Sequence, residues 1–162
     1  SPAVLAKELL AHPDVNGITI SGGEPMQQAA ALAETARLIR LHRDVSIISF
    51  TGYLYEDLLK TPQAPGVIPF LSEIDVLIDG PYIAHLNNFK GLRGSVNQRI
   101  IFLTDRLSAY NLEDTPRAAE INIQEGHAFL VGVPPKGMNS AFNSALRQLD
   151  ANKHTMVTYE RT

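Results

Sequence analysis

The feature that most constrains the fold is a short β-branched run that turns on two glycines into a helix-forming segment. Residues 17–28 read Gly-Ile-Thr-Ile-Ser-Gly-Gly-Glu-Pro-Met-Gln-Gln. The run Ile18-Thr19-Ile20 is typical of a buried strand, and the Ala- and Leu-rich segment 26–42 favours a helix. We expect this strand–helix pattern to recur along the chain and to build a parallel α/β sheet.

The two glycines and the acid that follows them form a candidate ligand site. Gly22 and Gly23 carry no Cβ, so a ligand can approach their backbone closely. The N-terminus of the following helix offers free N–H groups and a partial positive charge. A carboxylate at Glu24 can bind an ammonium or a hydroxyl group. A plain tight turn between strand and helix is the alternative, and these residues alone leave both open.

Further elements follow in alternation. Helices are predicted over residues 2–11, 26–42, 55–59, 68–74 and 139–153. Strands are predicted over residues 45–50 and 75–79, from about residue 100, over 118–124 and 128–133 as a hairpin, and over 155–159 as an edge strand. Because arginine is mostly exposed, Arg37, Arg40 and Arg43 are expected to form a solvated helix face.

Polar residues stand at the ends of the later strands. Thr51 and Gly52 follow strand 45–50, and Asp79 ends strand 75–79. The C-terminal ends of parallel strands are where α/β barrels bind ligands. Thr51 and Asp79 are equally able to cap the turns in which they lie.

A dense polar cluster precedes the apolar run that starts at residue 100. It consists of Asn97, Gln98 and Arg99. Arg99 is able to hold a carboxylate through two parallel hydrogen bonds. A structural arginine that ties loop carbonyls together is the alternative.

Composition narrows the possible functions. The 162 residues carry a formal net charge of −3, which argues against binding to nucleic acid or an anionic membrane. No apolar run approaches the ~20 residues of a membrane span, and no secretory pattern is present, so a cytoplasmic protein is expected. There is no cysteine, and the five histidines show no metal-binding spacing. The usual cysteine ligation of an iron–sulfur cluster is therefore excluded for this chain.

Four blocks, in order, resemble the radical S-adenosylmethionine (SAM) superfamily, and most closely the activating enzymes of anaerobic ribonucleotide reductases. Residues 21–25 resemble the superfamily's GGEP motif, and residues 51–58 resemble T-G-Y-T-Y-E-E-L. Residues 74–82 resemble I-D-V-L-V-D-G-P-F, and residues 93–101 match R-G-S-x-N-Q-R-I-I. The segment 131–135 is similar to the V-G-I-P-P ending of single-cluster members.

The resemblance implies a fold and a function. The fold would be a partial (β/α)6 barrel, mainly parallel, with a C-terminal hairpin and helix, in a single domain over residues 1–162. The protein would cleave SAM reductively to a 5′-deoxyadenosyl radical and use it to activate a glycyl-radical enzyme. Its cofactors would be SAM and one [4Fe–4S] cluster, and a reduced flavodoxin or ferredoxin would supply the electron. No residue stands out as a catalytic acid or base, because the chemistry belongs to the cofactors.

The resemblance also assigns roles to the candidate residues. Gly22, Gly23 and Glu24, with Pro25 behind them, would hold the amino group of SAM. Thr51, Gly52 and Asp79 would line the rest of the SAM site, and Asn97, Gln98 and Arg99 would hold SAM or the substrate loop. Gly132 would let the adenine approach the backbone, although a close strand crossing explains that glycine equally well.

The missing cysteines conflict with the resemblance. Radical SAM enzymes usually carry C-x3-C-x2-C upstream of the GGEP strand, whereas this chain opens at Ser1-Pro2 on a predicted helix. We expect the chain to be the C-terminal part of a longer protein whose cluster-binding segment precedes it. The alternatives are a radical SAM enzyme that acts on another substrate and a cluster-less, non-catalytic binding domain.

Overall fold

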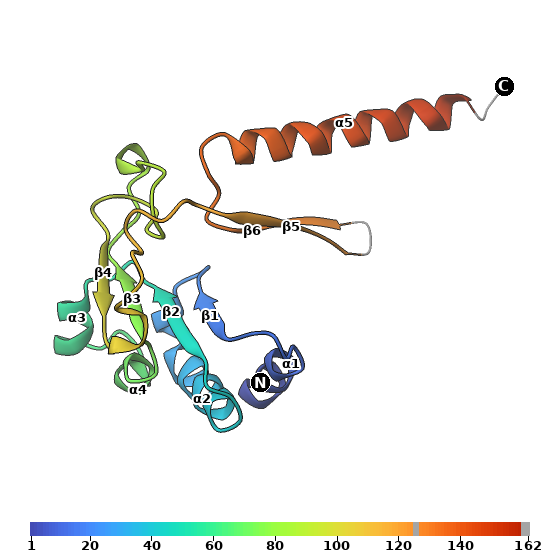
Figure 1. The fold of residues 1–162 in the computed structure, drawn as a ribbon. Coiled ribbons are helices and arrows are strands. Elements are labelled where there is room, and N and C mark those ends of the chain that lie inside the picture. Colours follow the sequence, from blue (N-terminus) through green and yellow to red (C-terminus); the bar gives the residue numbers. More distant parts are fainter. Residues whose placement is uncertain (125–126, 160–162) are drawn as a thin grey trace. The chain divides into compact units, whose positions relative to one another are not determined.

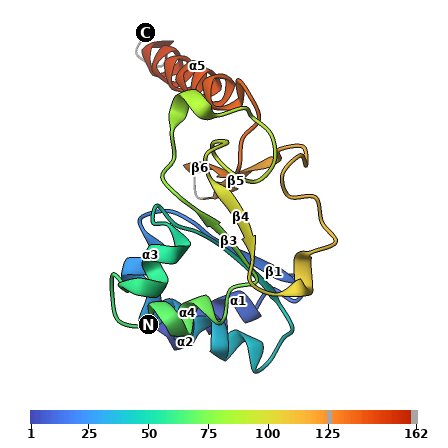
Figure 2. The same cartoon turned by 90° about the vertical axis from the view of Figure 1, so that its left-hand side faces the viewer.

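The computed structural model describes residues 1–124 and 127–159, and Figures 1 and 2 show it from two sides. The chain divides into two compact units. Unit 1 comprises residues 1–88 and 93–113, and unit 2 comprises residues 89–92 and the chain from residue 114. Unit 1 holds a sheet with its helices, and unit 2 holds a hairpin and a long helix.

Unit 1 is built on a four-stranded sheet with the order β1-β2-β3-β4. The strands are β1 (Gly17–Ile20), β2 (Ser46–Phe50), β3 (Val76–Asp79) and β4 (Arg99–Phe102). β1, β2 and β3 run parallel, with Ile18 beside Ile47. β4 is antiparallel to β3, with Arg99 opposite Asp79. The predicted mainly parallel sheet is confirmed, and its three parallel strands end at one edge.

The helices of unit 1 are short. They are α1 (Pro2–Leu10), α2 (Ala29–Arg40), α3 (Tyr55–Lys60) and α4 (Val67–Leu71), and α2 is the longest of them. Figures 1 and 2 place α1, α2 and α4 on one side of the sheet. α2 buries Ala29, Ala36 and Ile39 at helical spacing, and the fully buried Phe70 of α4 joins the same core. This apolar stripe packs into the core that covers one side of the sheet.

The predicted helix over residues 26–42 divides in two. A 3-10 turn, η1 (Pro25–Gln28), precedes α2, and Glu24 is its N-cap. Pro25 suits the first helical position, since its missing N–H would have no partner there. The 3-10 turn thus connects the glycine turn after β1 to the start of the α-helix.

The connection between β3 and β4 explains the antiparallel strand. It contains one 3-10 turn, η2 (Ala84–Leu86), and no α-helix. A parallel return usually runs through a helix, and this connection has none. The strand order β1-β2-β3-β4 is that of an open sheet, and a closed barrel is not seen among the described residues of unit 1. A further 3-10 turn, η3 (Asp105–Leu107), follows β4.

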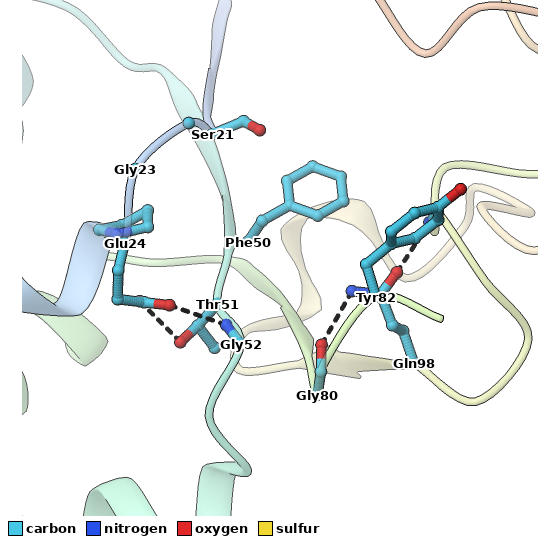
Figure 3. A pocket seen from close by; sticks show the side chains of 12 residues that line it. Ser21, Gly23, Glu24, Phe50, Thr51, Gly52, Gly80, Tyr82 and Gln98 are labelled. Atoms are coloured by element: carbon cyan, nitrogen blue, oxygen red, sulfur yellow. Dashed lines mark hydrogen bonds between the residues drawn. The ribbon is translucent and has the colours of Figure 1, made fainter. Parts of the chain in front are cut away.

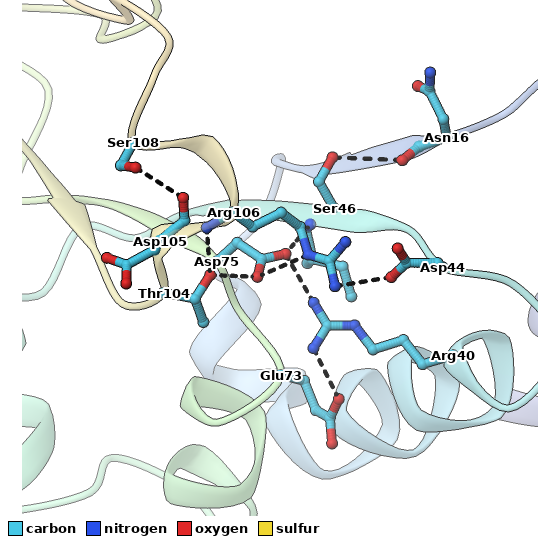
Figure 4. Close-up of polar contacts among 11 residues, drawn as sticks. Asn16, Arg40, Asp44, Ser46, Glu73, Asp75, Thr104, Asp105, Arg106 and Ser108 are labelled. Atoms are coloured by element: carbon cyan, nitrogen blue, oxygen red, sulfur yellow. Dashed lines mark hydrogen bonds and ion pairs between the residues drawn. The ribbon is translucent and has the colours of Figure 1, made fainter.

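An ion-pair network centred on Asp75 lies at the start of β3, away from the C-terminal ends of the parallel strands (Figure 4). Asp75 is 1% exposed. Its Oδ2 accepts hydrogen bonds from Arg40 Nη2 at 2.7 Å and from the Ile47 N–H at 2.8 Å. Its Oδ1 accepts from Thr104 Oγ1 at 2.6 Å and lies 3.5 Å from Arg106 Nε. This carboxylate ties α2, β2, β3 and the segment after β4 together.

The expected solvated arginine face is wrong for two of its three members. Arg37 is exposed, but Arg40 pairs with Asp75 and, at 3.4 Å, with Glu73. Arg43 donates to the carbonyl of His12 at 2.6 Å. Arg40 thus binds carboxylates next to β3, and Arg43 binds the backbone after α1. Helical spacing alone does not predict either contact.

Unit 2 consists of the hairpin β5 (Ala119–Gln124) and β6 (His127–Gly132), followed by α5 (Met138–Tyr159). The hairpin prediction is confirmed, and its predicted turn at residues 125–126 lies outside the described residues. The predicted edge strand over 155–159 is wrong, because α5 continues through it. No Gly or Pro after residue 137 interrupts that helix.

Within the described parts of the chain, no helix has both the length and the apolar character needed to cross a membrane.

Candidate functional site

A pocket of about 330 Å³ opens at the C-terminal edge of the parallel strands (Figure 3). Its walls come from the segments that follow β1, β2 and β3 and from the loop before β4. The lining residues are Ser21, Gly22, Gly23, Glu24, Pro25, Phe50, Thr51, Gly52, Gly80, Tyr82, Gly94 and Gln98. All of them belong to unit 1. Open parallel sheets bind ligands in the crevice outside this edge.

The glycine turn after β1 has a backbone that other residues rarely adopt. Gly22 has a φ of +83° and Gly23 a φ of +54°. A Cβ placed on Gly22 would meet no atom within 4 Å, and one on Gly23 would meet only Gln28 Nε2, at 3.9 Å. The conformation, rather than crowding, requires glycine here. Space beside the backbone therefore stays open to the pocket.

The carboxylate of Glu24 connects the ends of β1 and β2. Its Oε1 accepts hydrogen bonds from the Met26 N–H at 3.0 Å and from Thr51 Oγ1 at 2.9 Å. Its Oε2 accepts from the Gly52 N–H at 2.8 Å. The side chain is half-buried and lines the pocket. Because a carboxylate has about four acceptor positions, these three donors leave about one for a ligand.

Gln98 forms the opposite wall through its side-chain amide. Its Nε2 donates to the Gly80 carbonyl at 2.9 Å. Its Oε1 accepts from the backbone N–H groups of Gly94 at 2.9 Å and Ser95 at 3.1 Å. Gln98 is 6% exposed. The amide therefore holds the loop before β4 against the end of β3.

Asp79 and Arg99 pair with each other and are not among the pocket-lining residues. Asp79 is fully buried, and its Oδ1 accepts from Arg99 Nε at 2.9 Å. Its Oδ2 accepts from Arg99 Nη2 and from the Tyr55 N–H, the latter at 2.8 Å. Arg99 also binds both carboxylate oxygens of Glu56, at 3.0 and 2.7 Å. The arginine thus ties α3 to the strands β3 and β4.

The same contacts set the electrostatics of this ion pair. Hydrogen bonds from Arg99 lower the pKa of the Glu56 carboxyl to about 2, with the Glu56 backbone N–H as the next cause. Hydrogen bonds to Asp79, and then to Glu56, raise the pKa of the Arg99 guanidinium. Glu56 and Arg99 therefore both carry their charge near neutral pH, as an ion pair between them requires.

Two further predicted residues also lie outside the pocket lining. Asn97 is exposed, and its Nδ2 donates to the Pro81 carbonyl at 2.7 Å. Gly132 lies at the end of β6 in unit 2 with a φ of +114°. A Cβ on it would lie 2.7 Å from the Ala118 carbonyl oxygen and 3.1 Å from Ala119 Cα. The close strand crossing, one of the two interpretations offered above, therefore accounts for this glycine.

Five of the lining residues were not predicted from the sequence. These are Ser21, Phe50, Gly80, Tyr82 and Gly94. Ser21, Phe50 and Gly80 each directly precede or follow a predicted site residue in the sequence, so adjacency could have found them. Tyr82 and Gly94 come together only because the loop before β4 folds back. Both lie within family-like blocks of the sequence, but those blocks do not show that the two residues are neighbours in the pocket.

The residues of this chain do not fit an iron–sulfur cluster. The sequence has no cysteine thiolate to ligate iron. Among the described residues, no group of three or more His, Asp or Glu side chains could hold a metal ion. The residues of this chain therefore do not supply the ligands of such a cluster.

The chain is similar to the anaerobic ribonucleoside-triphosphate reductase-activating protein of Enterobacteria phage T4. The two are 31% identical over 107 residues, which cover 61% of this chain and 63% of that protein. The chain therefore matches less than two thirds of the length of its relative. No solved structure matches the chain.

A family model gives the broader assignment. The family described as "4Fe-4S single cluster domain" matches residues 3–101. This range is more than half of the chain and contains every residue that lines the pocket. The chain therefore belongs to the 4Fe-4S single cluster domain family.

Proposed function

We propose that this chain forms the SAM-binding part of a radical SAM enzyme that activates a glycyl-radical enzyme. The observation that carries the proposal is the carboxylate of Glu24, which lies in a pocket at the ends of parallel strands beside an open glycine turn. Family membership and the name of the phage relative support the same reaction class.

The pocket suits the methionine end of SAM chemically. Glu24 keeps about one free acceptor position, which can take an N–H of the ligand's ammonium group. Thr51 and Gly52 fix the orientation of the carboxylate before the ligand arrives. The volume of about 330 Å³ lies at the lower end of the range of small-molecule sites, roughly 300–1,000 Å³.

The cofactors would supply the chemistry, and the residues of this chain would bind and orient. A bound SAM, reductively cleaved, would provide the 5′-deoxyadenosyl radical of this enzyme class. Glu24 would hold the amino group, and the wall tied by Gln98 would limit access of water. Because the chain has no cluster ligand, the [4Fe–4S] cluster would have to be held by residues outside it.

The partners follow from the same proposal. The phage relative is, by its name, an activator of an anaerobic ribonucleoside-triphosphate reductase. A glycyl-radical enzyme of that class is the proposed partner here, with a reduced flavodoxin or ferredoxin as the proposed electron donor. The substrate hydrogen would come from a glycine of the partner enzyme.

The first experiment tests the binding role of Glu24. Equilibrium dialysis would measure the affinity of the protein for radiolabelled SAM and for methionine. Glu24→Gln should weaken both by roughly tenfold or more, because a charge-assisted hydrogen bond contributes about 1.5–3 kcal/mol. Glu34→Gln is the matched control, since Glu34 is an exposed residue of α2. No binding by the wild type, or equal binding by Glu24→Gln, would contradict the proposal.

A second candidate function is a non-catalytic binding domain, which needs no cluster ligands and so agrees with the lack of cysteine in this chain. The product of the complete gene, reconstituted anaerobically with iron and sulfide, separates the two candidates. An enzyme should release methionine and 5′-deoxyadenosine in equal amounts from SAM and dithionite. It should also produce a glycyl radical, detected by electron paramagnetic resonance, in the partner reductase. SAM binding without either product would favour the binding domain.

A further inference from the structure

We propose that Phe50 and Tyr82 form a second subsite of this pocket, which binds a planar purine ring. The inference rests on the proposed function, because it assigns the adenine end of the same ligand. Neither side chain takes part in the polar contacts around Glu24. Both line the pocket.

The pocket has a polar end and an aromatic end. Figure 3 shows Glu24, Phe50 and Tyr82 in that order across the view, with Glu24 directed at Thr51 and Gly52. Phe50 is the last residue of β2, directly before Thr51. A ligand with an ammonium group at one end and a flat ring at the other therefore matches the order of the lining side chains.

The ring of Tyr82 lies against a glycine. A Cβ on Gly94 would be 2.9 Å from Tyr82 Cδ2 and 3.3 Å from Cε2. It would also lie 3.0 Å from Gln98 Oε1. Any larger residue at position 94 would therefore push the ring from its place. Gln98 fixes Gly94 in turn by accepting a hydrogen bond from its N–H.

The backbone on both sides of Tyr82 is held by the loop before β4. Asn97 Nδ2 donates to the Pro81 carbonyl at 2.7 Å. The Ile83 N–H donates to Ser95 Oγ at 3.1 Å, and Ser95 is fully buried. These contacts give Asn97 a positioning role, although it does not line the pocket. Tyr82 is thus an exposed side chain on a fixed backbone.

A large aromatic side chain held in this way is suited to stacking. Tyr82 is 57% exposed, so a ring that covers it would remove apolar surface from water. Stacking of a base on an aromatic side chain tolerates any base, because every base has a π-face. Loss of one such contact typically weakens binding about 5- to 100-fold.

The test measures the two ends of the pocket separately. Ligand-observed NMR titrations of the protein with adenosine and with methionine would give two dissociation constants. Tyr82→Ala should weaken adenosine binding about 5- to 100-fold and leave methionine binding within twofold. Tyr82→Phe should keep adenosine binding. Tyr110→Ala is the matched control, because Tyr110 is 63% exposed and does not line the pocket.

A second variant displaces the ring without deleting it. Gly94→Ala should weaken adenosine binding in the same direction as Tyr82→Ala, with the fold of each variant checked by circular dichroism. Unchanged adenosine binding in a folded Tyr82→Ala would overturn the inference, as would a wild type that binds methionine but not adenosine. A wild type that binds neither methionine nor SAM would instead reject the proposed function itself.

Discussion

Two carboxylates, one at each end of the strands of one sheet, differ in how completely hydrogen bonds and ion pairs occupy their oxygens. Asp75, just before β3, is 1% exposed and is surrounded by Arg40, Ile47, Thr104 and Arg106. Glu24, just after β1, is half-buried, accepts three hydrogen bonds and lines a pocket. The partners of Asp75 include two arginines, whereas those of Glu24 are uncharged.

The difference separates structural from binding roles. A buried carboxylate that is already neutralised has nothing left to offer a ligand, and its removal takes the buried acceptor away from its partner cations. A carboxylate held only by neutral donors keeps its charge available to a cation. Asp79 follows the pattern of Asp75, since it is fully buried and binds Arg99. Position at a strand end is therefore a weaker guide to function than the set of partners.

The largest expected effect comes from breaking the Asp75 network. Asp75→Ala should lower the free energy of unfolding by about 3–5 kcal/mol, because Arg40 and Arg106 lose their buried partner. Urea unfolding followed by circular dichroism measures the change. Asp44→Ala is the control, since Asp44 pairs with Arg106 from an 81% exposed side chain and should change the midpoint little. A loss under about 1 kcal/mol for Asp75→Ala would contradict a structural role.

The second prediction compares two left-handed glycines, one packed and one beside the pocket. A Cβ on Gly66 would lie 2.4 Å from Ala30 Cα, whereas one on Gly22 would meet no atom within 4 Å. Gly66→Ala should therefore cost about 2–4 kcal/mol of unfolding free energy, and Gly22→Ala about 1 kcal/mol. The same urea titration measures both. Equal losses would mean that the turn at Gly22 is not open.

A smaller effect is expected from loosening Glu24. Thr51→Ala removes the hydroxyl that donates to Glu24 Oε1 and accepts from the Tyr53 N–H at 3.2 Å. We expect a stability loss of about 1–2 kcal/mol and a severalfold weaker affinity for methionine in equilibrium dialysis. Thr51→Ser keeps the hydroxyl and should preserve the affinity. A Thr51→Ala variant that binds as the wild type does would show that the carboxylate needs no such support.

Local patterns predicted most of the helices and strands, and they identified residues on the polar side of the pocket. The β-branched runs of β2 and β3 and the alanine spacing of α2 depend only on neighbours in sequence. The turn at Gly22, Gly23 and Glu24 also depends only on neighbours in sequence, because the two glycines and the acid follow one another directly. Predictions of this kind hold because the physical cause lies within a few residues.

The partners of buried charges could not be predicted in this way. Arg40 meets Asp75 across 35 positions of sequence, and Arg99 meets Glu56 across 43. An isolated arginine on a helix has the same local pattern whether it is solvated or paired. Likewise, the ring of Tyr82 packs against Gly94 only because the loop before β4 folds back toward the end of β3. Only the tertiary arrangement distinguishes these cases.

The smallest expected effect concerns the half-exposed pair of Glu56 and Arg99, whose side chains are 52% and 45% exposed. The pKa of Glu56 is lowered to about 2 by hydrogen bonds from Arg99, so the folded state binds its proton less readily than the unfolded state. The stabilisation is therefore fully present above the ordinary carboxyl pKa of about 4.3 and is lost as the pH falls toward 2. Solvent screening keeps it small.

Glu56→Gln isolates this contribution, because all other carboxyl groups are common to both proteins. The difference in urea midpoint between wild type and Glu56→Gln should be largest near pH 7, unchanged down to about pH 5, and smaller at pH 3. Screening by 1 M salt at pH 7 should reduce the same difference. A midpoint difference that stays constant from pH 7 to pH 3 would mean that the glutamine acts through packing on α3 and not through the ion pair. The charge of Arg99 would then be compensated by Asp79 alone.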